Sequence, residues 1–498
     1  MNKSLYSEIY AQYNKAGSKK SAIGRNGITT QAGINRRFYS GDQWGANAPH
    51  NRPLVRYNVI KRIGEFKTSA ILSAPLTVRF SARGDLSLDT QTSEAVNAMN
   101  EYFSAISERM GFDRVVMKAL KDSYITGTGI VYAYWDSEVH TGRFLDDLRK
   151  LEIRGDVKCE TVGIENVFFG DCDCTDVQKQ PYIIIARRMG VSKAKALALS
   201  FGNSPDEIVA DDSLDDKVTV LTRFRKTENS VVATITTPTA VIRDETSIGV
   251  RIYPIVAFRW EDNDCAYGES EVTHVIPNQI AINRMLTASV WSVMLSGMPI
   301  MAVNRDLLPN QSLSNEPGQV IDYTGPFEQI GNSVKYFTPP DYLNNYNETI
   351  SSLISQTLNQ TGANAVALGD VDPVNTSAII ALRDSALSPL QLYKCRFYEF
   401  CSDVAKLFAE FWVTMYSHRP LEGNGYIFEG DRLRGVLFDC MVDVSESVST
   451  NQEQSLSILN MLLEKGQISV SEYLERIPKG LVPDCKKLIE NRSKEENV

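Results

Sequence analysis

The chain has few histidines and lacks the short motifs that mark common enzyme classes. Only four of its 498 residues are histidine. The sequence contains no Walker A loop, dinucleotide-binding fingerprint, HExxH zinc motif, nucleophile elbow or paired CxxC spacing. These absences argue against an ATPase and against a classical metalloenzyme. We therefore expect no catalytic residues, no bound metal and no cofactor.

Long hydrophobic runs are missing as well. The longest, at 288–303, has sixteen residues and is interrupted by Ser, Gly and Pro, whereas a spanning helix needs ~18 or more apolar residues. We expect no membrane span and no membrane partner. Eight cysteines are scattered without regular spacing, and no secretion signal precedes them. This pattern predicts reduced thiols in a cytosolic protein.

Basic residues are outnumbered by acidic ones overall, 52 against 61, but they are concentrated at the start of the chain. The net charge is −9, which argues against a protein that coats DNA. Residues 1–67, however, hold twelve Lys and Arg against three acids, a net charge of +9. Such a segment is able to contact phosphates or an acidic partner, while the acidic remainder repels nucleic acid. The alternative is a solvated basic tail beside a mildly acidic body.

Mixed secondary structure is predicted for the N-terminal quarter. The polar first 35 residues predict a loosely held arm with one short helix near Leu5–Tyr13. Apolar residues at 59, 63, 66 and 70 predict a helix, and Pro75 ends it. A strand over 76–82 follows, and then a helical segment at 93–124 that breaks near Gly111.

The segment from about 129 to 260 is rich in short β-type runs. Examples are "GIVYAYW", "YIIIARR" and "KVTVLTRFR", and one short helix after Ser192 interrupts the series. Strands cluster here without the regular strand-helix alternation that a parallel, doubly wound sheet requires. The fold class is therefore α+β, and a nucleotide-binding Rossmann domain is disfavoured.

The second half of the chain predicts two helices around a small β module. Apolar spacing predicts a helix from Pro277 to Gly297, with the proline in its first turn. Extended pieces such as "MPIMAV", "GQVIDYT" and "SVKYFT" follow, and Asp341 opens a second helix. After a small-residue loop, a third helical stretch runs over 376–418 with a kink expected at Pro389.

Two weak candidates for chemistry stand out. "DCDCTD" at 171–176 offers thiols and carboxylates, but its spacing fits neither a zinc nor a calcium site, so the plainer interpretation is a polar turn. His274 follows Ser270 and Glu271 at helical spacing, and the plainer account there is a helix-start cap. "TGTGIVY" from Thr126 lacks the lysine of a phosphate loop and predicts a turn.

The order of these elements is similar to that of the portal proteins of tailed double-stranded DNA bacteriophages. The matching pieces are "RRFYSGDQW", "RYNVIKRIGEFKTSAILSAP", the β-rich middle, "YGESEVTHVIPNQIAINRMLTASV" and "TGANAVALGDVDPVNTSAIIALRDSAL". No single piece is as specific as a zinc signature. Their order and spacing together extend over most of the chain.

The resemblance implies a portal-like protomer with an α/β wing, a two-helix stem, a clip and a crown. Its parts are a basic flexible N-terminal arm at 1–35, a wing at 36–268, stem helix 1 at 269–297, a clip at 298–340, stem helix 2 at 341–361, a tunnel loop at 362–375, a long kinked helix with further wing strands at 376–449 and a helical crown at 450–498.

The same resemblance implies a homo-oligomeric ring, usually of twelve subunits, at one capsid vertex. Such a ring serves DNA packaging, retention and ejection. Its implied partners are the double-stranded DNA that passes through the channel, the large terminase subunit, the head-tail adaptor, and the major capsid and scaffolding proteins. The implied location is the virion, with the host cytoplasm during assembly. We expect the basic N-terminal segment to face capsid, scaffold or packaged DNA.

Two sets of residues carry the implied sites. The tunnel loop that lines the DNA channel corresponds to Thr361, Gly362, Asn364, Asp370, Asp372 and Asn375. The clip that docks partners contributes Asn304, Arg305, Asp322 and Lys335. Small and polar residues in the loop suit a lining that forms few lasting phosphate bonds, and an acidic wall lets a polyanion slide.

Two alternatives remain open from the sequence. One is another phage structural protein, such as a capsid or adaptor component. The other is an enzyme with an unrecognised site, a nuclease or hydrolase, in which Asp171, Asp173 or His274 takes part. Closed rings with an axial hole distinguish the portal from the first alternative, and loss of turnover on substitution identifies the second.

Overall fold

The structure of the protein is a computed structural model. It describes residues 2–45, 54–73, 76–82, 90–145, 150–211, 215–297, 300–304, 306, 326, 328, 331, 334–337, 343–363, 387–416, 419–421, 427–434, 438–444, 459–467 and 473. The chain divides into two units. Unit 1 comprises Met1–Thr29, Thr68–Glu269 and Leu390–Val498, and unit 2 comprises Thr30–Lys67 and Ser270–Pro389.

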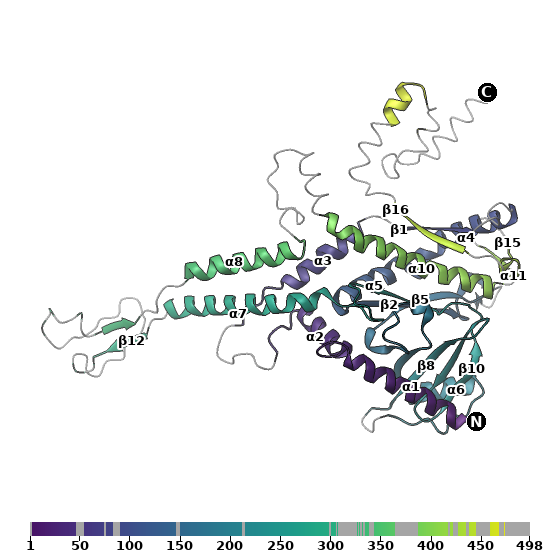
Figure 1. Cartoon of the computed structure of the whole chain (residues 1–498), viewed down its shortest axis with the longest axis horizontal. Helices are drawn as coiled ribbons and strands as arrows, with labels where there is room; N and C mark the ends of the chain where they lie inside the picture. Colours follow the sequence, from purple (N-terminus) through teal and green to yellow (C-terminus); the bar gives the residue numbers. More distant parts are fainter. Residues whose placement is uncertain are drawn as a thin grey trace. The chain divides into compact units, whose positions relative to one another are not determined.

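Helices form the longest elements (Figure 1). They are α1 (Asn2–Ala22), α2 (Ile28–Ser40), α3 (Val59–Ile71), α4 (Thr90–Met110), α5 (Phe112–Thr126), α6 (Val191–Ser200), α7 (Glu271–Gly297), α8 (Leu343–Gln360), α10 (Gln391–Met415) and α11 (Gly430–Leu433). Short 3-10 turns occupy Ile164–Asn166, Val177–Lys179 and Ser388–Leu390.

Most of the described strands lie between residues 76 and 259, and the others follow between residues 300 and 444. They are β1 (Leu76–Ala82), β2 (Thr128–Asp136), β3 (His140–Leu145), β4 (Lys150–Ile153), β5 (Asp156–Val162), β6 (Val167–Phe169), β7 (Ile183–Gly190), β8 (Lys217–Lys226), β9 (Val231–Thr236), β10 (Val241–Ser247), β11 (Ile255–Arg259), β12 (Ile300–Val303), β13 (Val334–Phe337), β14 (Arg419–Pro420), β15 (Ile427–Phe428) and β16 (Phe438–Val444).

Unit 1 contains two antiparallel sheets and several two-stranded pairs. The larger sheet has the strand order β10-β9-β8-β7-β6, and the smaller has β11-β2-β5. Each strand pairing among the described residues is antiparallel. The protein is thus mixed helix and sheet without a parallel doubly wound sheet, as the α+β prediction requires.

The core of unit 1 is built around an aromatic cluster. Phe103 contacts Phe80, Phe112, Phe408 and Trp412 in edge-to-face geometry at 5.2 to 6.2 Å between ring centroids. These rings come from β1, α4, α5 and α10, so the cluster joins segments that lie far apart in the sequence. Edge-to-face pairs add about 0.5 to 1.5 kcal/mol each beyond the area they bury. Phe408 and Trp412 of α10 are thus packed against three other elements of unit 1.

Three glycines allow the chain to cross itself between α5 and β2. The backbone at Gly127 has a φ of 94°, and a Cβ there would lie 2.2 Å from the carbonyl oxygen of Gly268. A Cβ on Gly129 would lie 1.9 Å from the carbonyl oxygen of Ala119. The amide of Gly268 donates to the hydroxyl of Thr128 at 2.9 Å. "TGTGIVY" is accordingly a turn into a strand, as predicted, and its glycines serve close backbone approach.

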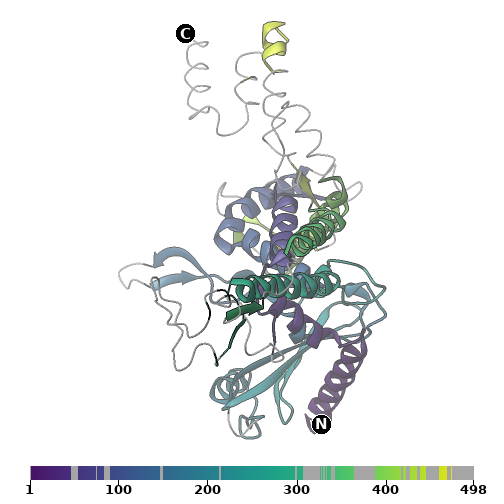
Figure 2. The ribbon, with the colours of Figure 1, turned by 90° about the vertical axis from the view of Figure 1, so that its left-hand side faces the viewer.

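The N-terminus differs from the expected loosely held arm with one short helix. α1 spans Asn2–Ala22 and lies beside the larger sheet in Figure 1 and Figure 2. Ile9 and Ala16 pack in one cluster with Phe168, Ile184 and other residues of that sheet. The polar composition hid this packing, because the few apolar residues of α1 lie on the face that meets the sheet.

Lys20 is buried between α1 and the larger sheet and is hydrogen-bonded to backbone carbonyls there. Its side chain is 1% exposed. The ammonium donates to the carbonyl oxygens of Ile164 and Val167, the latter at 2.9 Å. It also lies 4.3 Å from the centre of the Phe168 ring. Burial lowers the pKa of Lys20 to about 7, and the neighbouring Glu165 and Cys172 oppose that shift.

The glycine crossing predicts a strong effect from a single methyl group. Gly129→Ala places a Cβ against the Ala119 carbonyl, so we expect a loss of about 1 to 3 kcal/mol or more of unfolding free energy in denaturant titrations. Gly17→Ala in α1 is the matched control, because its Cβ would meet only a Phe168 ring carbon at 3.7 Å. Equal stability of the two variants would rule out the close approach.

Lys20 predicts a pH dependence of stability. An unfolded lysine keeps its usual pKa of 10.5 while the folded one titrates near 7, so between these values the unfolded chain binds more protons. The folded state therefore gains stability as the pH rises through this window. Relative to Lys20→Met, the natural protein should gain up to about 1.4 kcal/mol per pH unit when unfolding is titrated at several pH values from about 7.5 to 8.5.

Lys19→Met is the control for this prediction. The Lys19 side chain is 42% exposed and lies 3.9 Å from Asp171. The unfolding free energy of Lys19→Met should change with pH as that of the natural protein does across the same range. Parallel curves for Lys20→Met and the natural protein would contradict the assignment.

Candidate functional site

The long helix α7 begins earlier than the sequence predicts. We expected Pro277 in the first turn, but α7 starts at Glu271, six residues before it. The hydroxyl of Ser270 accepts a hydrogen bond from the Val272 amide at 3.1 Å and so caps the helix. This cap confirms the plainer account of the Ser270, Glu271 and His274 cluster. His274 itself is exposed on α7.

A buried polar stripe runs along α7. Gln279, Asn283 and Thr287 follow one another at intervals of four residues, so they share one face of the helix. Their exposed fractions are 0%, 2% and 5%. The three side chains bind the backbone of the segment 54–58, which leads into α3. We call this set of contacts the polar ladder.

Each rung of the polar ladder satisfies backbone groups of that segment. Thr287 accepts from the Val55 amide at 3.2 Å, and Asn283 accepts from the Tyr57 amide at 3.1 Å. Gln279 donates to the Tyr57 carbonyl at 2.7 Å. Gln279 and Asn283 are also bonded to each other at 3.0 Å. Backbone groups of an irregular, partly exposed segment thus find their partners on a helix more than 200 residues away.

Gln279 also caps α3. Its Oε1 atom accepts from the amides of Val59 at 2.9 Å and Ile60 at 3.4 Å. Asn58 accepts from the Lys61 amide at 3.0 Å as the local cap. The first three amides of α3, which no intrahelical carbonyl can satisfy, are therefore all bonded.

Two more contacts join the start of the chain to the start of α7. Asn35 donates to the hydroxyl of Thr273 at 3.0 Å. Lys67 and Glu271 form an ion pair at 2.5 Å, with side chains only 7% and 9% exposed. Residues 36–67, which we expected in the wing, accordingly belong to unit 2 together with α7. The reason is this hydrogen-bonded attachment, which hydrophobic periodicity does not reveal.

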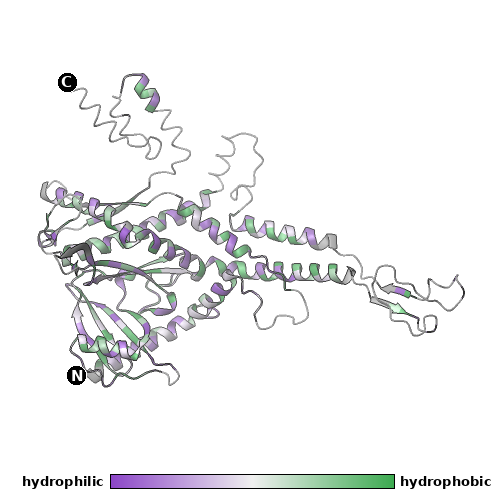
Figure 3. Cartoon of the chain, turned by 180° about the vertical axis from the view of Figure 1, so that it is seen from behind, coloured by the Kyte–Doolittle hydropathy of each residue, from purple (hydrophilic) through white to green (hydrophobic). Residues whose placement is uncertain are grey.

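α8 packs along α7, and the two helices run side by side in Figure 1 and Figure 3. Asn278 donates to the hydroxyl of Thr357 at 3.2 Å across their contact. Thr361 and Gly362, two of the residues expected to line a channel, close the end of α8. The Thr361 hydroxyl donates to the Thr357 carbonyl at 3.0 Å, and Gly362 follows with a φ of 76°.

The expected clip contains a pair of strands. β12 and β13 are antiparallel, with Ile300 opposite Phe337 and Val303 opposite Val334. This pair confirms two of the three extended pieces that the sequence predicts between the helices. Asn304 is exposed and accepts from the Asp306 amide at 3.0 Å, and Lys335 is exposed on β13.

Several predicted residues lie outside the described part of the chain. They are Arg305 and Asp322 of the clip, and Asn364, Asp370, Asp372 and Asn375 of the tunnel loop. The same holds for 376–386, the first part of the expected long helix, so the kink is not described. Pro389 lies in the 3-10 turn that precedes α10. Of the crown, the described residues form a short helix at 459–464 that ends before Gly466.

The outer part of α7 leaves apolar side chains in solvent. Val290, Val293 and Met294 are 37%, 52% and 47% exposed, whereas Ile282 of the same helix is fully buried. Within unit 2 the buried face of α7 beyond Ile282 is instead the polar ladder, since Asn283, Thr287 and Ser289 are buried there.

The segment 171–176 forms a turn held by one amide side chain. Gln180 accepts from the Asp171 amide at 2.9 Å and donates to the carbonyls of Asp171 and Cys174, both at 2.7 Å. Asp176 caps the following 3-10 turn. Among the residues that the structure describes, no group of three His, Cys, Asp or Glu side chains is placed to hold a metal ion.

No family model matches the chain, and no curated protein matches it. Of the helices in the described ranges, none has the length and hydropathy needed to cross a membrane.

The polar ladder predicts that its central side chain is needed for stability. Gln279→Met keeps the volume but removes the hydrogen bonds of this side chain to the amides of Val59 and Ile60 and to the carbonyl of Tyr57. Hydrogen bonds contribute about 0.5 to 1.5 kcal/mol each, so we expect a loss of about 2 to 4 kcal/mol in denaturant unfolding. Arg284→Met, at an exposed position of the same helix, should change stability by less than about 0.5 kcal/mol. A Gln279→Met protein as stable as the control would contradict this role.

Proposed function

We propose that this protein is the portal subunit of a tailed double-stranded DNA bacteriophage. Many copies, usually twelve, form a closed ring at one capsid vertex, and DNA passes through its centre during packaging and ejection. The observation that carries the proposal is the order of elements in unit 2. A long helix, α7, leads through the β12–β13 pair to a second helix, α8, which packs back along the first.

The exposed apolar residues of α7 support assembly with further copies. Val290, Val293 and Met294 are exposed among the described residues of unit 2. At about 100° per residue, Val290 and Met294 continue the face of α7 that carries Asn283 and Thr287, beyond the point where the segment 54–58 attaches. This end of α7 is available to a neighbouring subunit. Repeated around an axis, this head-to-tail contact closes into a ring.

The net negative charge of the chain supports a channel through which DNA passes without binding tightly to the channel wall. A ring of subunits with a net charge of −9 each repels phosphates overall, so few counterions are displaced and contacts stay weak. The tunnel loop at 362–375 adds small and polar residues that make few phosphate bonds. The basic segment 1–67 is proposed to face capsid, scaffold or packaged DNA.

The remaining partners follow from the proposed ring. The β12–β13 region is the part proposed to dock the terminase and later the head-tail adaptor, with Asn304, Arg305, Asp322 and Lys335 among the residues concerned. The proposed location is the capsid vertex of the virion, and the host cytoplasm during assembly.

Electron microscopy of the purified protein tests the proposal. We expect class averages of closed rings with about twelve subunits and an axial hole. Val293→Lys puts a charge into the proposed contact between subunits, so we expect it to shift the protein from rings to monomers in sizing chromatography while the melting temperature of the monomer stays unchanged.

Leu199→Lys is the matched control. Leu199 is 61% exposed on α6 in unit 1, so the change has the same chemistry at a position outside the proposed contact. Rings should survive it. A monomeric natural protein, or assemblies without a central opening, would refute the portal proposal.

A further inference from the structure

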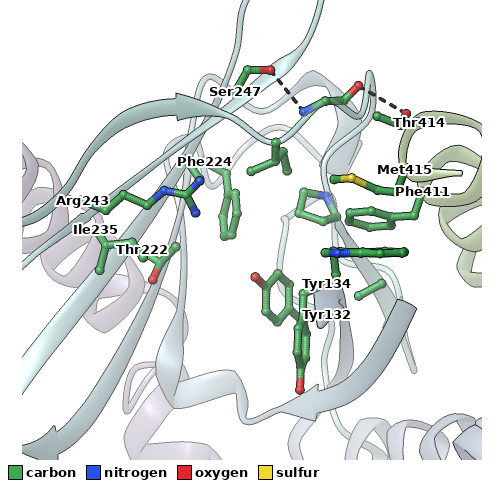
Figure 4. A pocket seen from close by; sticks show the side chains of 16 residues that line it. Tyr132, Tyr134, Thr222, Phe224, Ile235, Arg243, Ser247, Phe411, Thr414 and Met415 are labelled. Atoms are coloured by element: carbon green, nitrogen blue, oxygen red, sulfur yellow. Dashed lines mark hydrogen bonds between the residues drawn. The ribbon is translucent and has the colours of Figure 1, made fainter. Parts of the chain in front are cut away.

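Unit 1 contains a cavity that none of the functions above uses. Its volume is about 390 Å³, which lies within the range of small-molecule sites. One wall comes from β8, β9 and β10 of the larger sheet, and the opposite wall comes from β2 and the end of α10. Figure 4 shows Arg243 and Phe224 projecting from the first wall and Tyr132 and Tyr134 on the other side of the space.

The walls of the cavity are mainly aromatic. Tyr132 and Tyr134 are stacked, with ring centroids 5.3 Å apart and planes inclined by 22°. Phe224 lies 5.7 Å from Tyr132, and Trp135 and Phe411 complete the lining. Burial raises the pKa of Tyr132 to about 12, against the opposing effect of two arginines, so its hydroxyl stays protonated and is able to donate. Such walls suit a planar apolar group.

One cation of the lining lacks a carboxylate partner. Arg187 lies over the Tyr132 ring at 5.5 Å, but Glu160 neutralises it in an ion pair. Arg243 lines the cavity from β10 and stacks on the Phe201 ring at 4.9 Å. Within the described part of the chain, Arg243 has no ion pair. Its guanidinium therefore keeps donors for an anion that enters the cavity.

Hydrogen bonds hold the rim of the cavity in place. The Gly249 amide donates to the Ser247 hydroxyl at 3.1 Å, and the Thr414 hydroxyl donates to the Gly249 carbonyl at 3.4 Å (Figure 4). A Cβ at Gly249 would lie 2.5 Å from the Thr414 methyl carbon. The loop is thus fastened to the end of α10. A preformed site loses less entropy when a ligand binds.

We propose that this cavity binds a small amphipathic carboxylate, with its ring between the aromatic walls and its carboxylate on Arg243. A single arginine offers the two parallel donors that one carboxylate accepts. The site belongs to unit 1 alone, so the inference is independent of ring formation.

Fluorine NMR with the full chain tests the site. The probes are 3-(4-fluorophenyl)propionate and its uncharged amide, which has the same ring. We expect the acid to bind about tenfold more tightly than the amide, as a charge-assisted hydrogen bond implies. Arg243→Gln should remove this preference and leave the amide affinity unchanged.

Two further variants make the result specific. Arg188→Gln removes an exposed arginine of β7 that does not line the cavity, so the preference for the acid should persist. Ala233→Leu adds volume to the β9 part of the lining and should weaken both probes at least about fivefold, even if Arg243→Gln fails to fold. Absence of binding to the natural protein, equal affinity for acid and amide, or an unchanged preference in Arg243→Gln would each overturn the proposal.

Discussion

The buried polar face of α7 is the constraint on which unit 2 depends. A helix in a folded unit usually buries its apolar stripe and leaves polar residues in water. In α7 from Gln279 to Thr287 the arrangement differs, because Gln279, Asn283 and Thr287 are buried and bonded to the backbone of 54–58. That backbone belongs to no strand or helix. Removing the ladder would break several of its hydrogen bonds at once, so these side chains act together in holding the segment.

In the proposed ring, one helix serves both the fold and the assembly. Gln279, Asn283 and Thr287 attach the segment 54–58, and further along α7 the apolar Val290, Val293 and Met294 are exposed. Apolar surface at that position is unfavourable in water, and burying it against another copy is the simplest way to remove the cost. A monomer that satisfied its apolar stripe internally would have no comparable reason to associate. Under the proposed function, α7 thus both holds the segment 54–58 and carries the contact between copies.

The sequence predicted local elements well and their attachments poorly. Alternation placed β1 correctly, with Val78 and Phe80 buried, and the break at Gly111 separates α4 from α5 as expected. These features depend on residues close in the chain. The polar ladder depends on hydrogen bonds between residues more than 200 positions apart. Hydrophobic periodicity predicts that polar side chains such as those of the ladder are exposed on the surface. A signal was present in the spacing of Gln279, Asn283 and Thr287, but a polar stripe at that spacing usually faces solvent. The packing of α1 also depends on partners far along the chain, since Ile9 and Ala16 pack with Phe168 and Ile184.

A count of charges overestimates how many bases at the start of the chain are free to bind another molecule, because some of them have contacts within the fold. Of the twelve bases in residues 1–67, Lys20 is buried on backbone carbonyls and Lys67 is held by the buried Glu271. Lys19 lies near Asp171, from outside the segment. Part of the +9 excess therefore comes from bases that hold α1 and α3 in place and are not free to bind phosphates. Because two of these contacts are buried, salt screens them little, whereas exposed bases lose most of their attraction within a Debye length of about 8 Å at physiological ionic strength. A segment of this kind holds the fold together first and leaves only its exposed remainder for an acidic partner.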